Sequence, residues 1–319
     1  MFKRILVTGG NGYLGKRISA FLCMQKDISV TVASRLLTPY EPLENVDYVA
    51  IDLCSEGSSI DEIREILANI DCVIHLAALD APQCAASPIL ANDINVIGTI
   101  KLLEAAKLAG VQRFVYFSTA HIYGKPLVGE ISETTLPRPV HPYAITHKSA
   151  EDYVYMAHSL GQIQGIILRL SNAFGKPYDI PSDSPDLIVN DVCRQIMDQG
   201  KIILRTAGLQ YRNFITITDV TRATKHCVDM KSVQIGDGIF NLGGEKSLKI
   251  IEMAQLIINM ANKLFNRKIT LQTTKLTNSK IEDELFYSIA KLKATNFQLK
   301  NDVMEELEEI LLFYNENTW

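Results

Sequence analysis

Short apolar runs alternate with amphipathic stretches along the first 170 residues of the chain. Runs of four to eight residues rich in Val and Ile predict strands, and windows with an apolar residue every three or four positions predict helices. The predicted strands are 3–8, 28–34, 47–51, 72–76, 113–118 and 165–170, and the predicted helices are 12–24, 59–69, 92–109 and 143–160. This alternation predicts an α/β fold in which helices cover both faces of a doubly wound parallel sheet.

The pattern changes after Gly175. Pro177, Pro181 and Pro185 mark a long loop, and they are followed by a predicted helix, a predicted strand and two further helices: 186–199, 201–205, 247–265 and 301–315. Long loops of this kind are usually functional. We therefore expect two domains, one over 1–172 with returning segments near 212–242, and a smaller, interleaved C-terminal domain for substrate mainly over 173–319.

Three glycines follow the first predicted strand directly. Gly9 suits a tight turn out of the strand, Gly12 leaves no Cβ where a pyrophosphate approaches backbone N–H groups, and Gly15 lets the next helix pack closely on the sheet. The phosphates would lie at the helix N-terminus, where free N–H donors favour anions. The pattern predicts a Rossmann-type dinucleotide site, and the alternative is a strand-to-helix turn that binds nothing.

Composition and charge narrow the class of protein. The apolar fraction is 47% and the charged fraction 21%, which is typical of a globular protein. A net charge of −4 without Lys/Arg runs argues against nucleic acid as a partner. No apolar run is long enough for a membrane span, and we expect a cytoplasmic protein. The six cysteines form no C-x-x-C pair, so we predict neither a disulfide framework nor a metal site.

Further motifs follow along the chain, and together they resemble the extended short-chain dehydrogenase/reductase family of nucleotide-sugar epimerases, dehydratases and reductases. They are Thr8-Gly9-Gly10-Asn11-Gly12-Tyr13-Leu14-Gly15, Asp52-Leu53, His75-Leu76-Ala77-Ala78, Asn95-Val96-Ile97-Gly98-Thr99, Phe117-Ser118-Thr119, Tyr123-Gly124, Pro142-Tyr143, Arg169-Leu170-Ser171-Asn172 and Tyr211-Arg212-Asn213-Phe214. The resemblance covers nearly the whole chain. It implies a bound NAD or NADP and a nucleotide-sugar substrate.

The end of the second predicted strand bears on the choice of cofactor. Relatives that prefer NAD carry an acidic residue there, whereas this chain has Ser34 and Arg35. A hydroxyl beside a guanidinium suits a 2′-phosphate, so we expect NADP rather than NAD, unless Arg35 is only a solvated loop cation. The resemblance also implies cofactor contacts for the glycine turn and its neighbours, and for the fourth strand's exit: Gly9, Asn11, Gly12, Tyr13, Leu14, Gly15, Asp52, Leu53, Leu76, Ala77 and Ala78. Asp52 also fits a turn cap, and the two alanines also fit tight packing.

The resemblance places a catalytic tyrosine at Tyr143. The family's lysine stands four residues after that tyrosine, and here the position holds His147. Lys148 does not replace it, because on a helix four residues on lies about 40° from Tyr143 and five residues on about 140° away. The implied catalytic set is Asn95, Thr119, Tyr143 and His147, with Tyr143 and His147 also touching the cofactor.

A histidine in place of the lysine allows two interpretations, an active enzyme or a protein without turnover. With an ordinary pKa near 6.5, His147 would be partly cationic, would donate one hydrogen bond to the nicotinamide ribose, and would support Tyr143 less than a lysine does. Alternatively, the protein binds nucleotide without turnover, as a sensor or scaffold. Tyr143 and Thr119 are both present, which favours activity.

The two residues after Thr119 bear on which reaction the protein catalyses. Dehydratases that resemble this chain carry Asp-Glu there, and this chain has Ala120 and His121, so 4,6-dehydration is disfavoured. His121 is a candidate auxiliary acid/base, with a structural role as the alternative. His75 is read as structural.

On the substrate side, Arg212 matches an arginine that clamps a pyrophosphate in relatives, with a salt bridge as the alternative. Asn172 and Thr119 would contact substrate. The family also implies a homodimer formed through helices 92–109 and 143–160. We therefore expect an NAD(P)-dependent oxidoreductase or epimerase acting at a sugar secondary alcohol or ketone, at C4.

Overall fold

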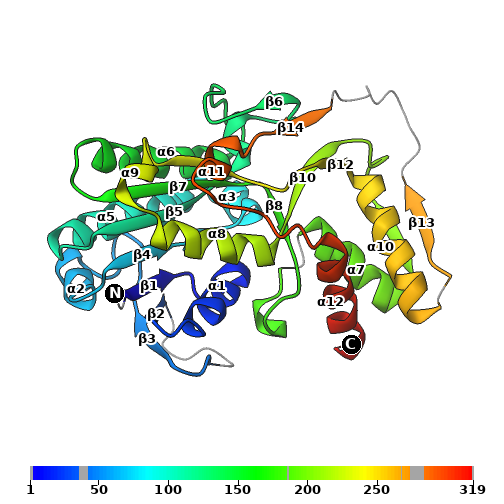
Figure 1. Cartoon of the computed structure of the whole chain (residues 1–319), viewed down its shortest axis with the longest axis horizontal. Coiled ribbons are helices and arrows are strands. Elements are labelled where there is room, and N and C mark those ends of the chain that lie inside the picture. The colour runs from blue at the N-terminus through cyan, green and yellow to red at the C-terminus, as the bar shows by residue number, and fades with distance from the viewer. Residues whose placement is uncertain (1–2, 36–41, 185–186, 267, 274–283, 318–319) are drawn as a thin grey trace. The chain divides into compact units, whose positions relative to one another are not determined.

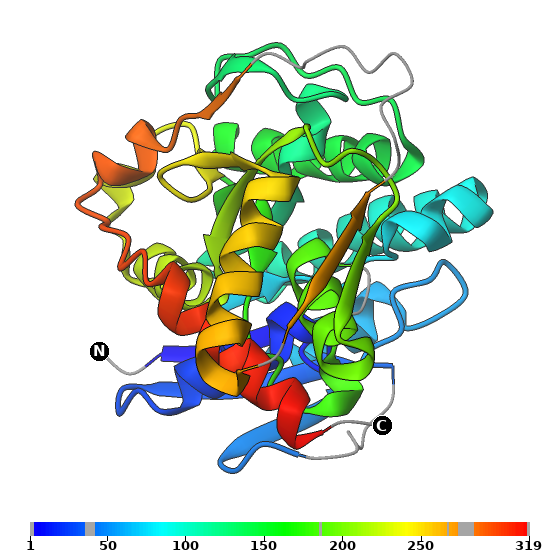
Figure 2. The same ribbon diagram turned by 90° about the vertical axis from the view of Figure 1, so that its right-hand side faces the viewer.

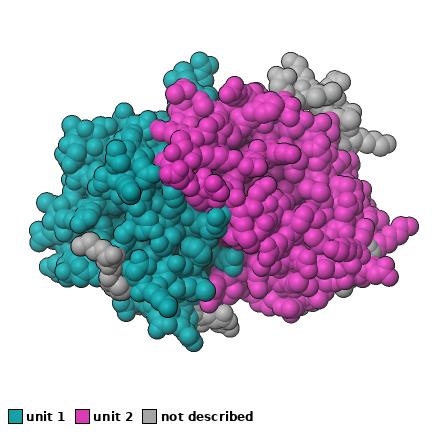
Figure 3. All heavy atoms as spheres, viewed as in Figure 1, with its two compact units in different colours: residues 1–125, 135–170, 221–241 teal, residues 126–134, 171–220, 242–319 magenta. Residues whose placement is uncertain are grey.

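The computed structural model describes residues 3–35, 42–184, 187–266, 268–273 and 284–317. The chain forms two compact units (Figure 3). Unit 1 comprises Met1–Lys125, Thr135–Leu170 and Thr221–Asn241, and unit 2 comprises Pro126–Thr134, Ser171–Val220 and Leu242–Trp319.

Unit 1 is built on a seven-stranded sheet with the order β11-β7-β5-β4-β1-β2-β3 (Figure 1). The strands are β1 Lys3–Thr8, β2 Ile28–Ser34, β3 Val46–Ala50, β4 Cys72–His75, β5 Arg113–Thr119, β7 Gln164–Leu170 and β11 Ile239–Leu242. The first six pair in parallel, for example Ile5 with Val30 and with Cys72. The six predicted strands are confirmed, and β11 is an addition that the apolar pattern did not predict.

Helices cover both faces of this sheet (Figure 1), which confirms the predicted doubly wound α/β class. One face packs against α2 Ile60–Ile66, α5 Gly98–Leu108 and α6 Pro142–Ser159, and the other carries α1 Tyr13–Cys23 and α8 Ile217–Asp229. Shorter helical segments are η2 Ala120–Tyr123, α3 Ala81–Ala86 and α9 Ser232–Ile235. Leu102 and Phe114, both fully buried, lie in the core between sheet and helices.

The predicted helix 92–109 begins earlier than expected. Pro88 starts α4 Pro88–Ala91, with Ser87 at its N-cap, and the chain continues through a π-helical turn, η1 Asn92–Ile97, into α5. Proline suits the first helical position because the lost N–H has no partner there. The wide π turn is a common device at functional sites.

Unit 2 combines three small sheets with a helical layer. The sheets are β8 Asn172–Phe174, β10 Tyr211–Thr216 and β12 Ser247–Lys249; β9 Lys201–Leu204 with β13 Thr270–Thr273; and β6 Gly129–Ile131 with β14 Leu285–Tyr287. Helices α7 Ile188–Gln199, α10 Ile250–Phe265 and α12 Val303–Glu316 pack together (Figure 2). Their shared core includes Ile196, Ile257 and Leu311, each fully buried.

Two short segments complete unit 2, η3 Ile180–Ser182 and α11 Ala290–Lys293. In the part of the chain that the structure describes, no helix combines the length and the apolar character that crossing a bilayer requires.

Candidate cofactor and catalytic site

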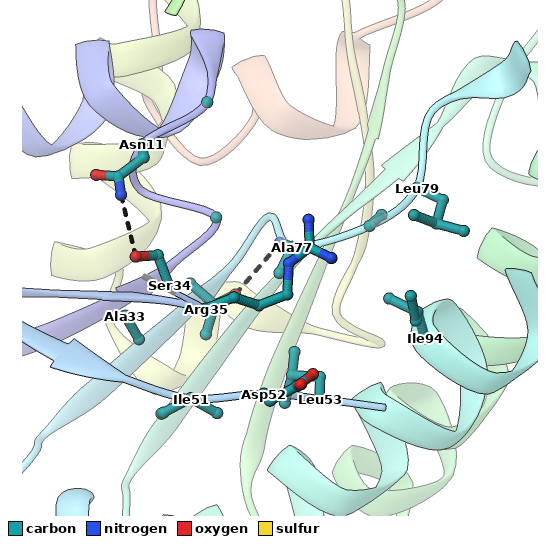
Figure 4. A pocket seen from close by; sticks show the side chains of 14 residues that line it. Asn11, Ala33, Ser34, Arg35, Ile51, Asp52, Leu53, Ala77, Leu79 and Ile94 are labelled. Atoms are coloured by element: carbon teal, nitrogen blue, oxygen red, sulfur yellow. Dashed lines mark hydrogen bonds between the residues drawn. The ribbon is translucent and has the colours of Figure 1, made fainter. Parts of the chain in front are cut away.

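A pocket lies at the carboxyl ends of the central strands of unit 1, with a cavity volume of about 210 Å³ (Figure 4). Its walls come from the ends of β1, β2 and β4, from the chain just after β3, and from η1. The lining residues are Thr8, Gly9, Asn11, Gly12, Ala33, Ser34, Arg35, Ile51, Asp52, Leu53, Ala77, Ala78, Leu79 and Ile94. Because the strand order reverses between β1 and β4, the pocket occupies the position where open α/β sheets bind ligands.

The glycine turn has the backbone that a dinucleotide requires. Gly9 has a φ of +67°, and a Cβ there would lie 2.8 Å from the Ala77 nitrogen. A Cβ on Gly15 would lie 2.1 Å from the Gly9 carbonyl oxygen, so α1 packs directly on the turn. Gly12 is the N-cap of α1 and provides no side-chain cap, which leaves the first N–H groups of the helix to a ligand. The turn therefore fits a pyrophosphate.

Most of the predicted cofactor residues line this pocket. Gly9, Asn11, Gly12, Ser34, Arg35, Asp52, Leu53, Ala77 and Ala78 do so, whereas Tyr13, Leu14, Gly15, Leu76, Tyr143 and His147 are not among the lining residues. Sequence reasoning missed Thr8, Ala33, Ile51, Leu79 and Ile94. Four of these are immediate neighbours of predicted residues, so position after a strand could have found them. Ile94 precedes Asn95 of the predicted catalytic set and reaches the pocket from the π turn η1, which the sequence did not predict.

The end of β2 brings two polar side chains to the pocket. The Asn11 amide nitrogen donates a hydrogen bond of 3.0 Å to the Ser34 hydroxyl, and Arg35 is exposed. Figure 4 shows the Arg35 side chain extending across the pocket between the Asn11–Ser34 pair and the Leu79–Ile94 end. An exposed guanidinium and a hydroxyl therefore both lie at the rim of the pocket.

Asp52 has two roles in the local structure. It lines the pocket, and its Oδ1 accepts a hydrogen bond of 3.1 Å from the Cys54 nitrogen. One carboxylate oxygen therefore supports a turn in the loop after β3, as expected of a turn cap.

Tyr143 lies in the first turn of α6, which begins with the His141 side chain as N-cap and Pro142 at the first position. Thr119 is the last residue of β5 and is buried. Burial raises the pKa of Tyr143 to about 12, and a hydrogen bond with the Thr119 hydroxyl acts in the opposite direction. The structure therefore brings together the phenol and hydroxyl that the sequence paired.

His147 lies one helical turn beyond Tyr143, with the two rings 4.2 Å apart between centroids. The His147 Nδ1 is 2.9 Å from the Tyr143 carbonyl oxygen. Because a carbonyl only accepts, Nδ1 carries the proton and Nε2 presents a lone pair. Burial lowers the pKa of His147 to about 4. Burial thus favours a neutral ring at pH 7 over the partly cationic one expected from the sequence, and the Nδ1 proton faces the Tyr143 carbonyl.

Lys148 points away from this site, as helical geometry requires. Its ammonium pairs with Asp152 and lies 3.8 Å from Glu151. Glu151 is itself buried and accepts from Arg169 at 2.6 Å and from the Ser118 hydroxyl at 2.8 Å. This ion pair fixes α6 against β5 and β7.

The two remaining residues of the predicted catalytic set are engaged in local hydrogen bonds. Asn95 is buried; its Oδ1 accepts from the Leu79 nitrogen at 2.7 Å and its amide donates to the Thr146 hydroxyl at 3.1 Å. The His121 backbone nitrogen donates to the Thr119 hydroxyl at 3.2 Å, while its imidazole is half-buried. Asn95 thus connects a pocket wall with the helix of Tyr143.

Asn172 and Arg212 belong to unit 2, whereas all other predicted site residues belong to unit 1. Asn172 is in register with Phe214, so Asn172 and Arg212 lie on the same face of the three-stranded sheet. The Asn172 amide donates to the Asn213 carbonyl at 2.9 Å, and an Arg212 guanidinium nitrogen donates to the Tyr211 carbonyl at 3.0 Å.

The parallel sheet, the uncapped glycine turn and the half-buried tyrosine beside a threonine define an α/β enzyme of the dinucleotide-dependent type. The chain belongs to the NAD-dependent epimerase/dehydratase family, whose model matches residues 5–243. This confirms the resemblance to the extended short-chain dehydrogenases/reductases.

The chain is similar to individual relatives at modest identity. It is 25% identical over 329 aligned positions to mouse (Mus musculus) dTDP-D-glucose 4,6-dehydratase, covering 99% of this chain and 89% of the relative. It is 28% identical over 255 positions to a putative UDP-glucose 4-epimerase of Methanocaldococcus jannaschii, covering 79% and 81%. Both 4-epimerases and 4,6-dehydratases are therefore among its relatives.

Solved structures share the fold over the whole chain. A UDP-N-acetylglucosamine 4-epimerase from Methanobrevibacter ruminantium, in complex with UDP-N-acetylmuramic acid, superimposes with a TM-score of 0.82 at 24% identity, covering 99% of both chains. A UDP-glucuronic acid 4-epimerase from Bacillus cereus in complex with NAD gives a TM-score of 0.82 at 24% identity, covering 99% and 100%.

Proposed function

We propose that this protein is an NAD(P)-dependent 4-epimerase of a nucleotide-linked sugar, which oxidises a secondary alcohol at C4 and reduces the resulting ketone on its other face. The observation that carries the proposal is the pairing of the Tyr143 phenol with the Thr119 hydroxyl at the carboxyl end of β5. Family membership and relatives named as 4-epimerases support it. The reaction returns its hydride to the substrate, so the cofactor stays bound through the cycle.

The residues have separate roles in this proposal. The nicotinamide ring, when bound, supplies the hydride acceptor and donor. The Tyr143 phenolic oxygen takes the proton of the sugar hydroxyl and returns it, and Thr119 orients the sugar oxygen. His147, with a lone pair on Nε2, accepts a hydrogen bond from a ribose hydroxyl, where a lysine would donate one. Asn95 and His121 support the backbone of this region.

We assign the dinucleotide to unit 1, which carries the glycine turn. Within unit 2, we propose Asn172 and Arg212, on one face of its three-stranded sheet, as contacts for a nucleotide sugar. Arginine suits a pyrophosphate because its planar fork donates two parallel hydrogen bonds.

For the cofactor we propose NADP, on the basis of Arg35 at the pocket rim and the Asn11–Ser34 pair beside it. Calorimetric titration with NADP and NAD tests this. Tighter binding of NADP, lost in Arg35→Ala but kept in the control Arg64→Ala on α2, supports it, and a preference for NAD in the unmodified protein refutes it. The test is needed because a structural neighbour, the Bacillus cereus UDP-glucuronic acid 4-epimerase, is described as a complex with NAD rather than NADP.

A panel of UDP-, dTDP-, GDP- and CDP-sugars tests the reaction itself. An epimerase converts one of them to an isomer of equal mass, separable by chromatography, without net change in nicotinamide absorbance. A product lighter by the mass of one water would instead indicate 4,6-dehydration. This is the main competing reaction, because some relatives are named as 4,6-dehydratases. Ala120 and His121, where such enzymes carry Asp-Glu, disfavour it. Tyr143→Phe should abolish conversion while leaving dinucleotide binding intact.

A second candidate is a nucleotide-binding protein without turnover. It is favoured by the burial of His147, which keeps the ring neutral, and by the Tyr143 pKa of about 12, on which no cation acts within the described part of the chain. Dinucleotide binding with no conversion across the panel, at any pH between 6 and 10, would select this candidate.

We also propose that the protein is a homodimer. Along α6, Ile145, Tyr153, Met156 and Leu160 are 40–64% exposed and recur at helical spacing on one face. A second copy of this face would bury them. Sedimentation of the unmodified protein as a dimer, and of Met156→Glu as a monomer, is the expected result.

A further inference from the structure

A continuous series of buried polar side chains runs from the glycine turn to the backbone of Tyr143, entirely within unit 1. Its first link joins the Thr8 hydroxyl to His75 Nδ1 at 2.6 Å, and its second joins His75 Nε2 to the Thr99 hydroxyl at 2.9 Å. Thr99 donates to the Asn95 carbonyl at 2.6 Å. His75, Thr8, Thr99 and Asn95 are each at most 2% exposed, so no solvent replaces these bonds.

The series continues from Asn95 to the catalytic helix. The Asn95 amide donates to the Thr146 hydroxyl at 3.1 Å, and Thr146 donates to the Tyr143 carbonyl at 3.0 Å. The other end of the Asn95 amide accepts from the Leu79 nitrogen. Thr8 and Leu79 line the pocket, so the series touches it at two points.

Each proton between Thr8 and Asn95 has a determined position. The Asn95 carbonyl only accepts, so Thr99 spends its hydroxyl proton there and must accept from His75. His75 is therefore protonated on Nε2, and its Nδ1 accepts the proton of Thr8. The Thr8 oxygen in turn accepts from the Leu76 and Ala77 nitrogens, both at 3.3 Å. Only a neutral imidazole donates and accepts at once in this way.

We propose that His75 is a positioning residue for the reaction assigned above, since it keeps the dinucleotide turn in a fixed position relative to Asn95 and, through Thr146, to Tyr143. This inference rests on the proposed function for its catalytic consequence. Burial also lowers the pKa of His75 to about 3, in agreement with a neutral ring. A purely structural role predicts a loss of stability alone, whereas positioning predicts a loss of turnover in variants that still fold and bind.

Four variants separate these roles. Thr99→Val removes the middle link without touching His75, and His75→Leu removes both imidazole bonds. His75→Gln keeps a donor toward Thr99, and it should rescue part of the activity. His158→Leu is the control, because His158 is another histidine of unit 1 that makes two hydrogen bonds, to Gly236 and Gly165, outside the series.

Two measurements are made on each variant. For Thr99→Val and His75→Leu we expect kcat to fall at least about tenfold while KM for the sugar and the Kd for dinucleotide change less than about threefold. The second measurement needs no turnover. Binding of a dinucleotide with an oxidised, cationic ring should lower the pKa of Tyr143, which is measured by phenolate absorbance with Tyr143→Phe as the reference. This decrease in pKa should be smaller in both variants than in the unmodified protein.

The outcomes distinguish the two proposals. A smaller pKa drop in Thr99→Val with no conversion of any sugar by the unmodified protein supports the role of His75 and overturns the proposed function. An unchanged pKa drop and unchanged kcat in folded Thr99→Val overturn the role of His75 and leave the function standing. If His75→Leu does not fold, Thr99→Val and His75→Gln decide.

Discussion

Replacing His147 by lysine should make Tyr143 more acidic and the protein faster. His147 is neutral at pH 7, with a pKa of about 4, and its ring lies 4.2 Å from that of Tyr143. An ammonium at this distance lowers a neighbouring pKa by ~1–3 units, or ~1.4–4 kcal/mol. Because position 147 is only 4% exposed, desolvation of the ammonium favours the lower part of this range.

The expected effect on turnover follows from the Tyr143 pKa of about 12. At pH 7 about 1 phenol in 10⁵ is ionised, and a pKa lower by one to two units raises this fraction ~10–100-fold. A phenolate of lower pKa is also a weaker base, so kcat should rise by less, about tenfold. The unmodified protein should show turnover that climbs with pH and has no inflection near 6.5.

Phenolate absorbance measured against Tyr143→Phe gives the pKa, and a pH series of kcat gives the turnover. Lys148→Met is the matched control, because Lys148 is adjacent in sequence but pairs with Asp152. An unchanged Tyr143 pKa in a folded His147→Lys protein would refute the electrostatic reasoning. A clear inflection near 6.5 in the unmodified protein would refute the neutral imidazole.

Two further predictions concern stability. Folding lowers the pKa of His75 to about 3 and of His147 to about 4, so the unfolded chain binds more protons below pH 6.5 and the free energy of unfolding falls as pH drops through that value toward 4. Urea unfolding at pH 5 and 7 should differ by about 2 kcal/mol for each histidine, and no difference would contradict their burial as neutral rings. In the glycine turn, Gly15→Ala places a Cβ 2.1 Å from a carbonyl oxygen and should cost about 3 kcal/mol or more by the same measurement, whereas Gly12→Ala meets its nearest atom at 3.3 Å. Gly12→Ala should therefore fold almost normally but bind dinucleotide more weakly by calorimetry, and equal stability losses in both would refute the packing argument.

The central sheet could be predicted from the sequence because its inner strands β1, β4, β5 and β7 are buried on both faces and form short, nearly continuous apolar runs. β11 was missed because Asn241 interrupts its four residues, and only the structure shows that this amide accepts from the Tyr123 hydroxyl at 2.7 Å. The start of the helix before Asn92 was missed because the proline at position 88 reads equally as a loop or as a first helical turn.

The residues of the site could also be predicted from the sequence, but the protonation states of their side chains could not. The family resemblance paired Tyr143 with Thr119, and helical spacing placed His147 one turn beyond Tyr143. The charge of His147 depends on its burial and on the Tyr143 carbonyl, which are tertiary properties. His75 looked like an isolated structural histidine, since its partners Thr8 and Thr99 lie 67 and 24 positions away in the sequence.

The strand order of unit 1 has a consequence for biosynthesis. β11, at one edge of the sheet, comes from Ile239–Leu242. Before reaching β11 the chain enters unit 2 twice, at Pro126 and at Ser171, and it returns to unit 1 each time. A ribosome must therefore translate through residue 242 before the sheet can close, which takes about 10–50 seconds at ordinary elongation rates. β7 presents an open edge while residues 171–242 are made, which takes about 4–14 seconds at the same rates. Nascent chains stalled before residue 239 should bind chaperones that recognise exposed strands, and those stalled well beyond 242 should not.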